Sequence, residues 1–169
     1  MAELSLLTER ELRFVRALVQ HEVRFLIVGL SAAALQGAPV VTQNVDLWVD
    51  RLDDPRFSAA LQQVGGAYVA PTPLTPPMLA GEGLELFDVV LGTSGLESFD
   101  EEWNGAIELT VGDVVTRVLP LTRILASKRA ANRPKDRLVI PVLESVVALQ
   151  VALGQGDPTT DPSNSAGGT

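Results

Sequence analysis

The sequence predicts an α/β protein in which one β-sheet is flanked by helices. Two observations predict this class. Apolar runs of strand length, such as residues 45–49 and 84–91, alternate with segments of helical periodicity. Two further runs, 106–111 and 114–119, flank the dipeptide Gly112-Asp113, which is typical of a two-residue antiparallel hairpin turn.

The chain has the size and composition of a single soluble domain. Its 169 residues are enough to bury a core, and 46% of them are apolar against 20% charged. We expect residues 1–153 to form this domain. Residues 154–169 are rich in Gly, Ser, Pro and Thr, so we expect them to be disordered.

Several protein classes are disfavoured by what the sequence lacks. No apolar run of about 18 residues is present, so we expect no membrane span, and the first residues lack the layout of a signal peptide. Without Cys there is no disulfide, thiol nucleophile or zinc–thiolate site, which fits a cytoplasmic protein. The net charge of −8 disfavours unaided nucleic-acid binding, because that binding needs Lys and Arg to neutralise phosphates.

The first expected helix begins at a capping box. Thr8 and Glu11 have the spacing at which each side chain bonds the other residue's backbone amide, and the helix should run to about Gln20. His21 ends this helix. Because the chain has no second His and no Cys, we interpret His21 as a helix-end or surface residue rather than a catalytic one.

The rest of the chain is organised around residues 25–50. A buried strand over 25–28 leads into a glycine turn, Gly29-Leu30-Ser31, and then into a short Ala-rich helix that ends near Gln36. After a Gly-Ala-Pro break, a second strand follows at 45–49.

Polar side chains line one face of this second strand. Successive side chains of a strand point to opposite faces, so two sets form here. One face carries Asn44, Asp46, Trp48 and Asp50, and the other carries Val45, Leu47 and Val49 toward the core. The Cα atoms of Asn44 and Asp46 should lie about 6.5 Å apart. That spacing allows both side chains to reach one cation or one phosphate-bound metal.

Capping and breaking residues delimit the next segments. Asp54 has the position of an N-cap with Pro55 at the first helical position, which predicts a helix over 56–64. Capping and solvation therefore explain the local aspartates better than a metal cluster does. Residues 67–70 predict a short strand, and the prolines of 71–77 predict an irregular loop over the surface near the site.

A carboxylate interrupts the strong strand predicted over 84–91. Placing Asp88 inside this apolar run is costly unless the side chain has a partner or a metal. The alternative is an Asp that faces solvent on an edge strand. We expect a polar, acidic connection over 99–103 to follow.

Two helices are expected in the last third of the chain. One runs over 122–131, and the final one opens at Pro141 and runs to about Leu153. Apolar residues cover most of the final helix, which indicates burial or a surface for a homodimer or a protein partner. Between the two helices, five of the 13 basic residues fall within 128–137.

Three of these features, in this order, resemble the nucleotidyltransferase fold (the polymerase-beta-like superfamily). The closest likeness is to small bacterial nucleotidyltransferases of the abortive-infection and toxin–antitoxin type. The first feature is Gly29 followed by the strand Thr42-Gln43-Asn44-Val45-Asp46-Leu47, the second is Asp88, and the third is a K-x4-R-x-K-D element from Lys128 to Asp136. The resemblance covers about residues 25–144 and implies a mixed, twisted sheet flanked by helices.

The resemblance also implies a role for each of these residues. Asn44, Asp46 and Asp88 would be the catalytic and metal-binding set, with Mg²⁺ as the cofactor and a nucleoside triphosphate as the substrate. The nucleotide would contact Gly29, Leu30, Ser31, Thr42, Lys128 and Lys135, with both lysines ahead of Arg129 in neutralising the triphosphate or contacting the acceptor. Alternatively, the basic residues form a solvated helix terminus that complements the helix dipole. Asp136 would cap the next turn or pair with Arg137.

Two positions depart from the pattern of the family. Leu30 stands where a second Gly or Ser is usual, and Asn44 stands where the first carboxylate is usual. Asn44 can offer a carbonyl oxygen to Mg²⁺ but no charge. The resemblance then implies an impaired, Mg-dependent transfer of a nucleotide to a hydroxyl of a protein, an RNA or a small molecule.

Three alternatives to an impaired enzyme stay open. The first is a catalytically inactive relative that binds a nucleotide or a protein as an antitoxin-like or regulatory module. The second is an active enzyme into which Asn44 was introduced to silence it. The third is an interaction domain of another class whose motifs match by chance.

Overall fold

The computed structural model describes residues 7–154. The predicted disordered tail therefore lies outside the described residues, apart from Gly154. Within the described range the chain forms an α/β fold, which confirms the predicted class. No helix of this range is long and apolar enough to cross a membrane.

A mixed five-stranded sheet forms the centre of the fold, in the order β5-β2-β1-β7-β6. Its strands are β1 (Phe25–Val28), β2 (Val45–Val49), β5 (Phe87–Val90), β6 (Ile107–Val111) and β7 (Val114–Val118). The pairs β1–β2 and β6–β7 are antiparallel, whereas β1–β7 and β2–β5 are parallel. Two outer strands, β3 (Ala67–Val69) and β4 (Met78–Ala80), form a separate antiparallel ribbon.

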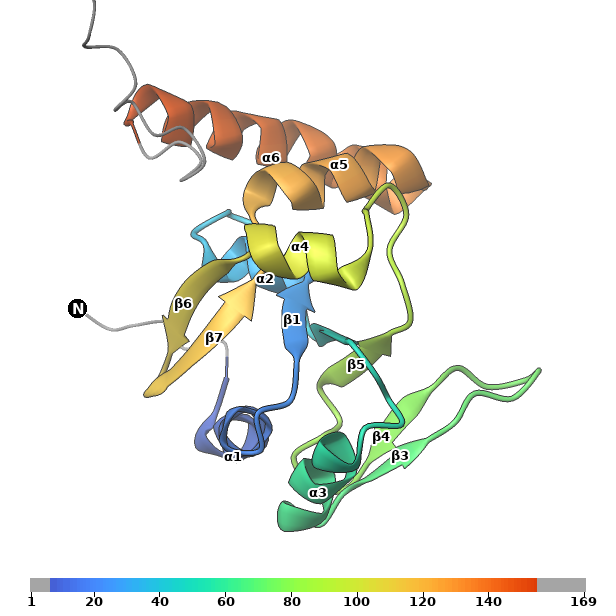
Figure 1. The fold of residues 1–169 in the computed structure, drawn as a ribbon. Coiled ribbons are helices and arrows are strands. Elements are labelled where there is room, and N and C mark those ends of the chain that lie inside the picture. Colours follow the sequence, from blue (N-terminus) through green and yellow to red (C-terminus); the bar gives the residue numbers. More distant parts are fainter. Residues whose placement is uncertain (1–6, 155–169) are drawn as a thin grey trace, which may run out of the picture.

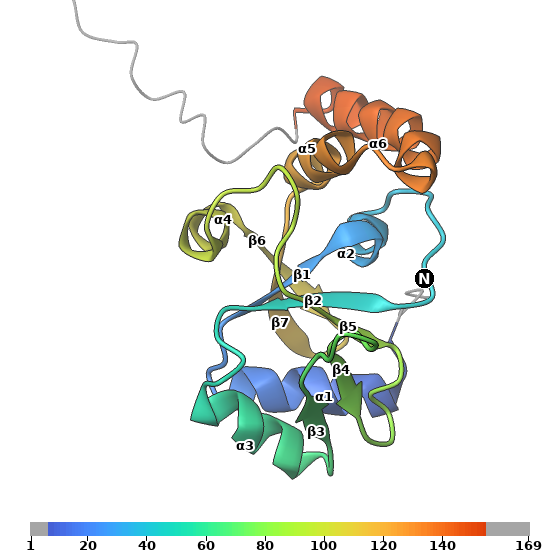
Figure 2. The ribbon, with the colours of Figure 1, turned by 90° about the vertical axis from the view of Figure 1, so that its right-hand side faces the viewer.

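Helices gather at two opposite ends of this sheet. They are α1 (Glu9–Gln20), α2 (Gly29–Leu35), α3 (Pro55–Gln63), α4 (Phe99–Gly105), α5 (Leu121–Ala131) and α6 (Pro134–Ala152). α1 and α3 pack together at one end, and α5 and α6 pack side by side at the other, with α2 between α5 and the sheet (Figures 1 and 2).

Local chemistry explains the element boundaries that the sequence predicted. The Thr8–Glu11 capping box opens α1, and the Asp54 side chain accepts a hydrogen bond from the Arg56 backbone amide at the start of α3. Gly112 has φ +62° between the paired residues Val111 and Val114, as a two-residue hairpin turn requires.

The core lies on both faces of the central strands. β1 is buried along its whole length, and Phe14 of α1 meets Phe87 of β5 edge to face with ring centroids 5.1 Å apart. Trp48 shares a strand face with the polar residues, but it is buried because Phe99 of α4 packs against it with centroids 5.3 Å apart. The polar face of β2 is therefore open only near its first residues.

Two expectations about helices were wrong in detail. Residues 99–105 form the helix α4 rather than a polar connection, because Ser98 and Glu101 form a capping box. The final helix begins at Pro134 and keeps Pro141 in its interior, since Arg133 and Asp136 cap its first turn. Residues 71–77 form an exposed irregular turn between β3 and β4, as the prolines predicted.

The outer face of α6 is apolar and exposed. Leu138 is 79% exposed and Leu149 is 58% exposed, whereas Leu143 on the opposite face is fully buried. The expected homodimer or partner contact through this helix stays a prediction.

Candidate functional site

A cleft of about 680 Å³ lies between the sheet and the α5–α6 pair. Its walls come from the end of β1, the first residues of β2, β5 with the loop that follows it, the inner face of α5 and the first turns of α6. Eight of the nine site residues expected from the sequence line it, namely Gly29, Leu30, Thr42, Asn44, Asp46, Asp88, Lys128 and Lys135. Ser31 lies outside this lining, and so does every residue of 71–77, which were expected near the site.

Asp46 and Asp88 lie side by side in the cleft. They are direct register partners on the parallel strands β2 and β5, so their Cα atoms are separated by one strand spacing, about 4.8 Å. Asp46 is half-buried and Asp88 is exposed. Burial raises the pKa of Asp46, and the neighbouring charge of Asp88 raises it further, while the basic residues across the cleft oppose both effects.

Asn44 connects directly to this carboxylate pair. Its side-chain Nδ2 donates a hydrogen bond of 2.7 Å to Oδ2 of Asp88. The hydroxyl of Thr42 donates to the backbone oxygen of Asn44 at 2.9 Å, which fixes the chain as it enters β2. The three polar residues expected from the sequence thus converge, with Asn44 acting as a hydrogen-bond donor to Asp88.

Gly29 makes room for the Asp46 carboxylate at the junction of β1 and α2. It has φ +64°, and an added Cβ would lie 2.3 Å from Oδ2 of Asp46. No other residue fits here without moving the carboxylate, so the glycine turn and the acidic strand form one unit. Leu30 follows at the first turn of α2 and is partly exposed in the cleft.

Ser31 supports Asp46 from behind. Its buried hydroxyl donates to the backbone oxygen of Val28 at 2.8 Å and accepts from the backbone amide of Asp46 at 3.1 Å. These two bonds tie β1, α2 and β2 together. The geometry therefore assigns Ser31 to positioning Asp46 and gives no support to its expected contact with a nucleotide.

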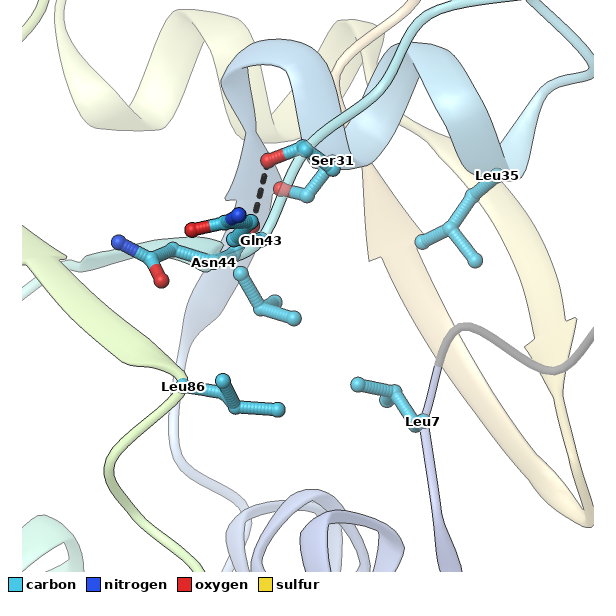
Figure 3. A pocket seen from close by; sticks show the side chains of 8 residues that line it. Leu7, Ser31, Leu35, Gln43, Asn44 and Leu86 are labelled. Carbon is cyan, nitrogen blue, oxygen red and sulfur yellow. Dashed lines mark hydrogen bonds between the residues drawn. The ribbon is translucent and has the colours of Figure 1, made fainter.

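A small apolar hollow lies on the other side of Ser31 and Asn44. Leu7, Leu35 and Leu86 point toward it from three different segments (Figure 3). Its volume is about 20 Å³, which leaves room for about one water molecule. This hollow is a packing defect behind the site and is too small for a substrate.

Asp136 organises the basic wall of the cleft. Its carboxylate is almost fully buried and accepts from Arg133 Nε at 2.7 Å, and it lies 3.5 Å from Lys128 Nζ. The Arg133 hydrogen bond is the main reason that the pKa of Asp136 falls to about 2. Of the two alternatives for Asp136, the capping contact forms, because its Oδ2 accepts from the Arg133 backbone amide at 3.0 Å, whereas Arg137 bonds Asn132.

The two lysines at the cleft differ in what they contact. Lys128 is largely buried, with 15% of its side chain exposed, and is held near Asp136. Lys135 is exposed in the cleft, and among the described residues it has no hydrogen-bond or ion-pair partner. Arg129, which we expected to contact the nucleotide less than either lysine, pairs with Glu144 and does not line the cleft.

Hydroxyl groups that the sequence analysis missed form another part of the lining. Thr93, Ser94 and Ser127 come from the loop after β5 and from α5. The Thr93 hydroxyl is buried, and within residues 7–154 it has no hydrogen-bond partner. No sequence motif marks this loop, although its position after the Asp88 strand places it at the same end of the sheet.

The donor set fits one hard divalent cation. Mg²⁺ is commonly bound by one or two carboxylates, with phosphate and water completing its shell, and Asp46 and Asp88 supply that pair. No group of three or more His, Cys, Asp or Glu side chains in the described part of the chain could hold a metal. A two-ion site with three bridging carboxylates therefore does not fit these residues.

Comparisons with known proteins show similarity in fold but not in sequence. No protein-family model and no curated protein sequence matches the chain. The solution structure of the antibiotic-resistance factor ANT(2'')-Ia matches at 15% identity and TM-score 0.55, covering 85% of this chain and 86% of that chain.

Two further solved structures are similar to this chain. The crystal structure of ANT(2'')-Ia with adenylyl-2''-tobramycin matches at 15% identity and TM-score 0.55, with coverage of 83% and 90%. An antigenic nucleotidyltransferase-like protein from Paracoccidioides brasiliensis matches at 16% identity and TM-score 0.48, with coverage of 85% and 78%. The chain therefore shares the fold of ANT(2'')-Ia, with the mixed sheet flanked by helices that the sequence predicted.

Proposed function

We propose that the cleft binds a nucleoside triphosphate and that the protein transfers the nucleotidyl group to a hydroxyl acceptor with the help of Mg²⁺. One observation carries this proposal. Asp46 and Asp88 are register partners that face the basic wall of Lys128 and Lys135 across one cleft of about 680 Å³. A metal–triphosphate needs carboxylates that bind its cation and, opposite them, ammonium groups that bind its phosphates.

The basic wall would bind the phosphates. Lys135 is free to turn its ammonium group toward a ligand, whereas Lys128 and Arg133 are pre-positioned by Asp136. Asp136 shares its single charge between these two cations, so they keep part of their positive charge for an anion in the cleft. Positioned cations of this kind stabilise the negative charge that grows on a leaving pyrophosphate.

The carboxylate pair would hold the cation and take the proton. Asp46 and Asp88 would hold Mg²⁺, which would neutralise phosphate charge and orient the reacting groups. The acceptor oxygen attacks the α-phosphorus, the bond to pyrophosphate breaks, and the hydroxyl proton passes to a carboxylate. Asp46 and Asp88 both line the cleft, and the carboxylate oxygen nearer to the acceptor would accept this proton.

The acceptor would meet the hydroxyl-lined part of the cleft. The ANT(2'')-Ia structure contains adenylyl-2''-tobramycin, a nucleotide joined to a small molecule. In this chain Thr93, Ser94 and Ser127 offer uncharged hydrogen-bonding groups, and the Thr93 hydroxyl has no partner in residues 7–154. These groups suit the hydroxyl of a small molecule, a protein or an RNA end.

A second candidate function is nucleotide or protein binding without catalysis, as in an antitoxin-like or regulatory module. The Asn44–Asp88 hydrogen bond favours it, because Asp88 is engaged by an amide where the family has another carboxylate. Label transfer separates the two functions. Transfer from a nucleoside triphosphate supports the enzyme, and binding without transfer supports the module.

Calorimetric titration of the four nucleoside triphosphates with Mg²⁺ tests the proposed cleft. Lys135→Ala should weaken binding about tenfold or more, because it removes the cation that the structure leaves free for phosphate. Arg129→Ala removes the same charge outside the cleft, from a pair with Glu144, and should leave binding unchanged. Equal affinities of the two variants, or no binding at all, would contradict a phosphate site at this wall.

A further inference from the structure

The contact between Asn44 and Asp88 has a consequence for the number of cations in the cleft. Asn44 Nδ2 lies 2.7 Å from Asp88 Oδ2. Two ionised carboxylates cannot approach in this way unless a cation or a proton lies between them, because like charges repel. An amide N–H group provides the link without any ion.

We propose that Asn44 takes the place of one divalent cation, so that the cleft binds its nucleotide with a single divalent ion shared by Asp46 and Asp88. This inference rests on the proposed nucleotide site and specifies its metal content. The amide N–H of Asn44 holds the Asp88 carboxylate without an ion, and Asp46 and Asp88 would hold the single cation.

The surroundings of Asn44 hold it beside Asp88. Its NH₂ group donates to Asp88, and the Thr42 hydroxyl bond fixes the backbone of Asn44. Asn44 is exposed, so the hydrogen bond is not imposed by dense packing.

The charges around the cleft agree with one ion. A third carboxylate at position 44 would place three negative groups side by side at one end of the sheet. Across the cleft, Arg133 and Lys128 already share the Asp136 carboxylate, and Lys135 alone is unpaired among the cleft cations of the described chain. A triphosphate beside three carboxylates would need a second cation, whereas beside two carboxylates it needs one.

Counting bound Mn²⁺ by electron paramagnetic resonance, with a saturating non-hydrolysable triphosphate analogue, tests this inference. The unmodified protein should bind one Mn²⁺ per chain with the analogue, and Asn44→Asp should bind two. Gln43→Glu adds the same charge one residue away in the cleft lining and should still bind one. Asn44→Ala removes the hydrogen bond without adding charge and should also bind one.

Calorimetry with the analogue in EDTA and in Mg²⁺ gives a second readout. The ratio of the two dissociation constants should be at least tenfold larger for Asn44→Asp than for the unmodified protein, and Gln43→Glu should resemble the unmodified protein. Two Mn²⁺ ions in the unmodified protein, or one in a folded Asn44→Asp, would overturn this inference alone. Failure of every variant to bind the analogue would overturn the proposed function and this inference with it.

Discussion

Gly29→Ala tests the close approach between the glycine turn and the Asp46 carboxylate. The new Cβ would lie 2.3 Å from Asp46 Oδ2, which is roughly 1 Å shorter than the shortest ordinary van der Waals contact. A left-handed conformation costs a non-glycine residue about 1–2 kcal/mol, and overpacking costs about 1–3 kcal/mol more. We therefore expect a loss of about 2–5 kcal/mol in the free energy of unfolding.

Gly37→Ala is a matched control for the backbone part of this loss. Gly37 also has positive φ, +91°, but an added Cβ there meets nothing within 4 Å. Urea unfolding should give a loss of only about 1–2 kcal/mol for this variant. Calorimetry with Mg²⁺ and nucleotide should show weaker binding for Gly29→Ala alone, because only that change displaces Asp46.

A double-mutant cycle isolates the contact itself. In an Asp46→Ala background the atoms that lie 2.3 Å and 3.3 Å from the new Cβ are gone, and the Asp46 Cβ at 3.6 Å is at ordinary contact distance. Gly29→Ala should then cost no more than Gly37→Ala, which gives a coupling free energy of about 1–3 kcal/mol. Additive effects of the two changes, or equal losses for the two glycine variants, would refute the contact.

Three further predictions concern the support of the site and the surface of α6. Asp136 has a pKa of about 2 against an ordinary 3.8, so its stabilisation is complete above about pH 4 and is lost as the pH falls toward 2. Asp136→Asn should therefore lower the free energy of unfolding by about 2–3 kcal/mol at pH 7, and the midpoint of urea unfolding should then change less between pH 4 and pH 2. Ser31→Ala leaves the Val28 oxygen and the Asp46 amide without the Ser31 hydroxyl as a partner. It should lower the free energy of unfolding by about 1–3 kcal/mol in the same measurement, whereas an unchanged urea midpoint would contradict the role of Ser31 in positioning Asp46. Leu149→Glu should dissociate any homodimer formed through α6, which light scattering after gel filtration would show as a change to the mass of one chain. A variant that still has the mass of a dimer would place the contact on another surface.

The elements that the sequence predicted best are those with strong local signals. β1 and β2 occupy the expected residues because apolar runs between turn residues define them. α4 was missed because a helix of seven residues with an acidic first turn shows no apolar stripe, although the Ser98–Glu101 capping box was a visible signal. The start of α6 was misplaced because Pro134 and Pro141 give the same local signal, and capping by Asp136 decides between them.

The candidate site was predictable only where strand alternation fixes it. Alternation along β2 places Asn44 and Asp46 on one face, but the register that brings Asp88 beside Asp46 is a long-range pairing that no local pattern encodes. The two contacts of Ser31 and the unpartnered Thr93 hydroxyl depend on packing between segments far apart in the sequence. Residue types and chain order therefore indicated a site, whereas its division into positioning and binding residues required the structure.

The charge distribution explains how an acidic chain can still have an anion-binding cleft. The net charge is −8, and most arginines outside the cleft are neutralised locally, as in the pairs Arg24–Asp50 and Arg129–Glu144. The long-range field therefore repels polyanions, which disfavours unaided binding of a nucleic acid. A compact metal–triphosphate carries much less charge and needs only short-range contacts, which Lys135 and the Asp136-positioned cations supply within the cleft.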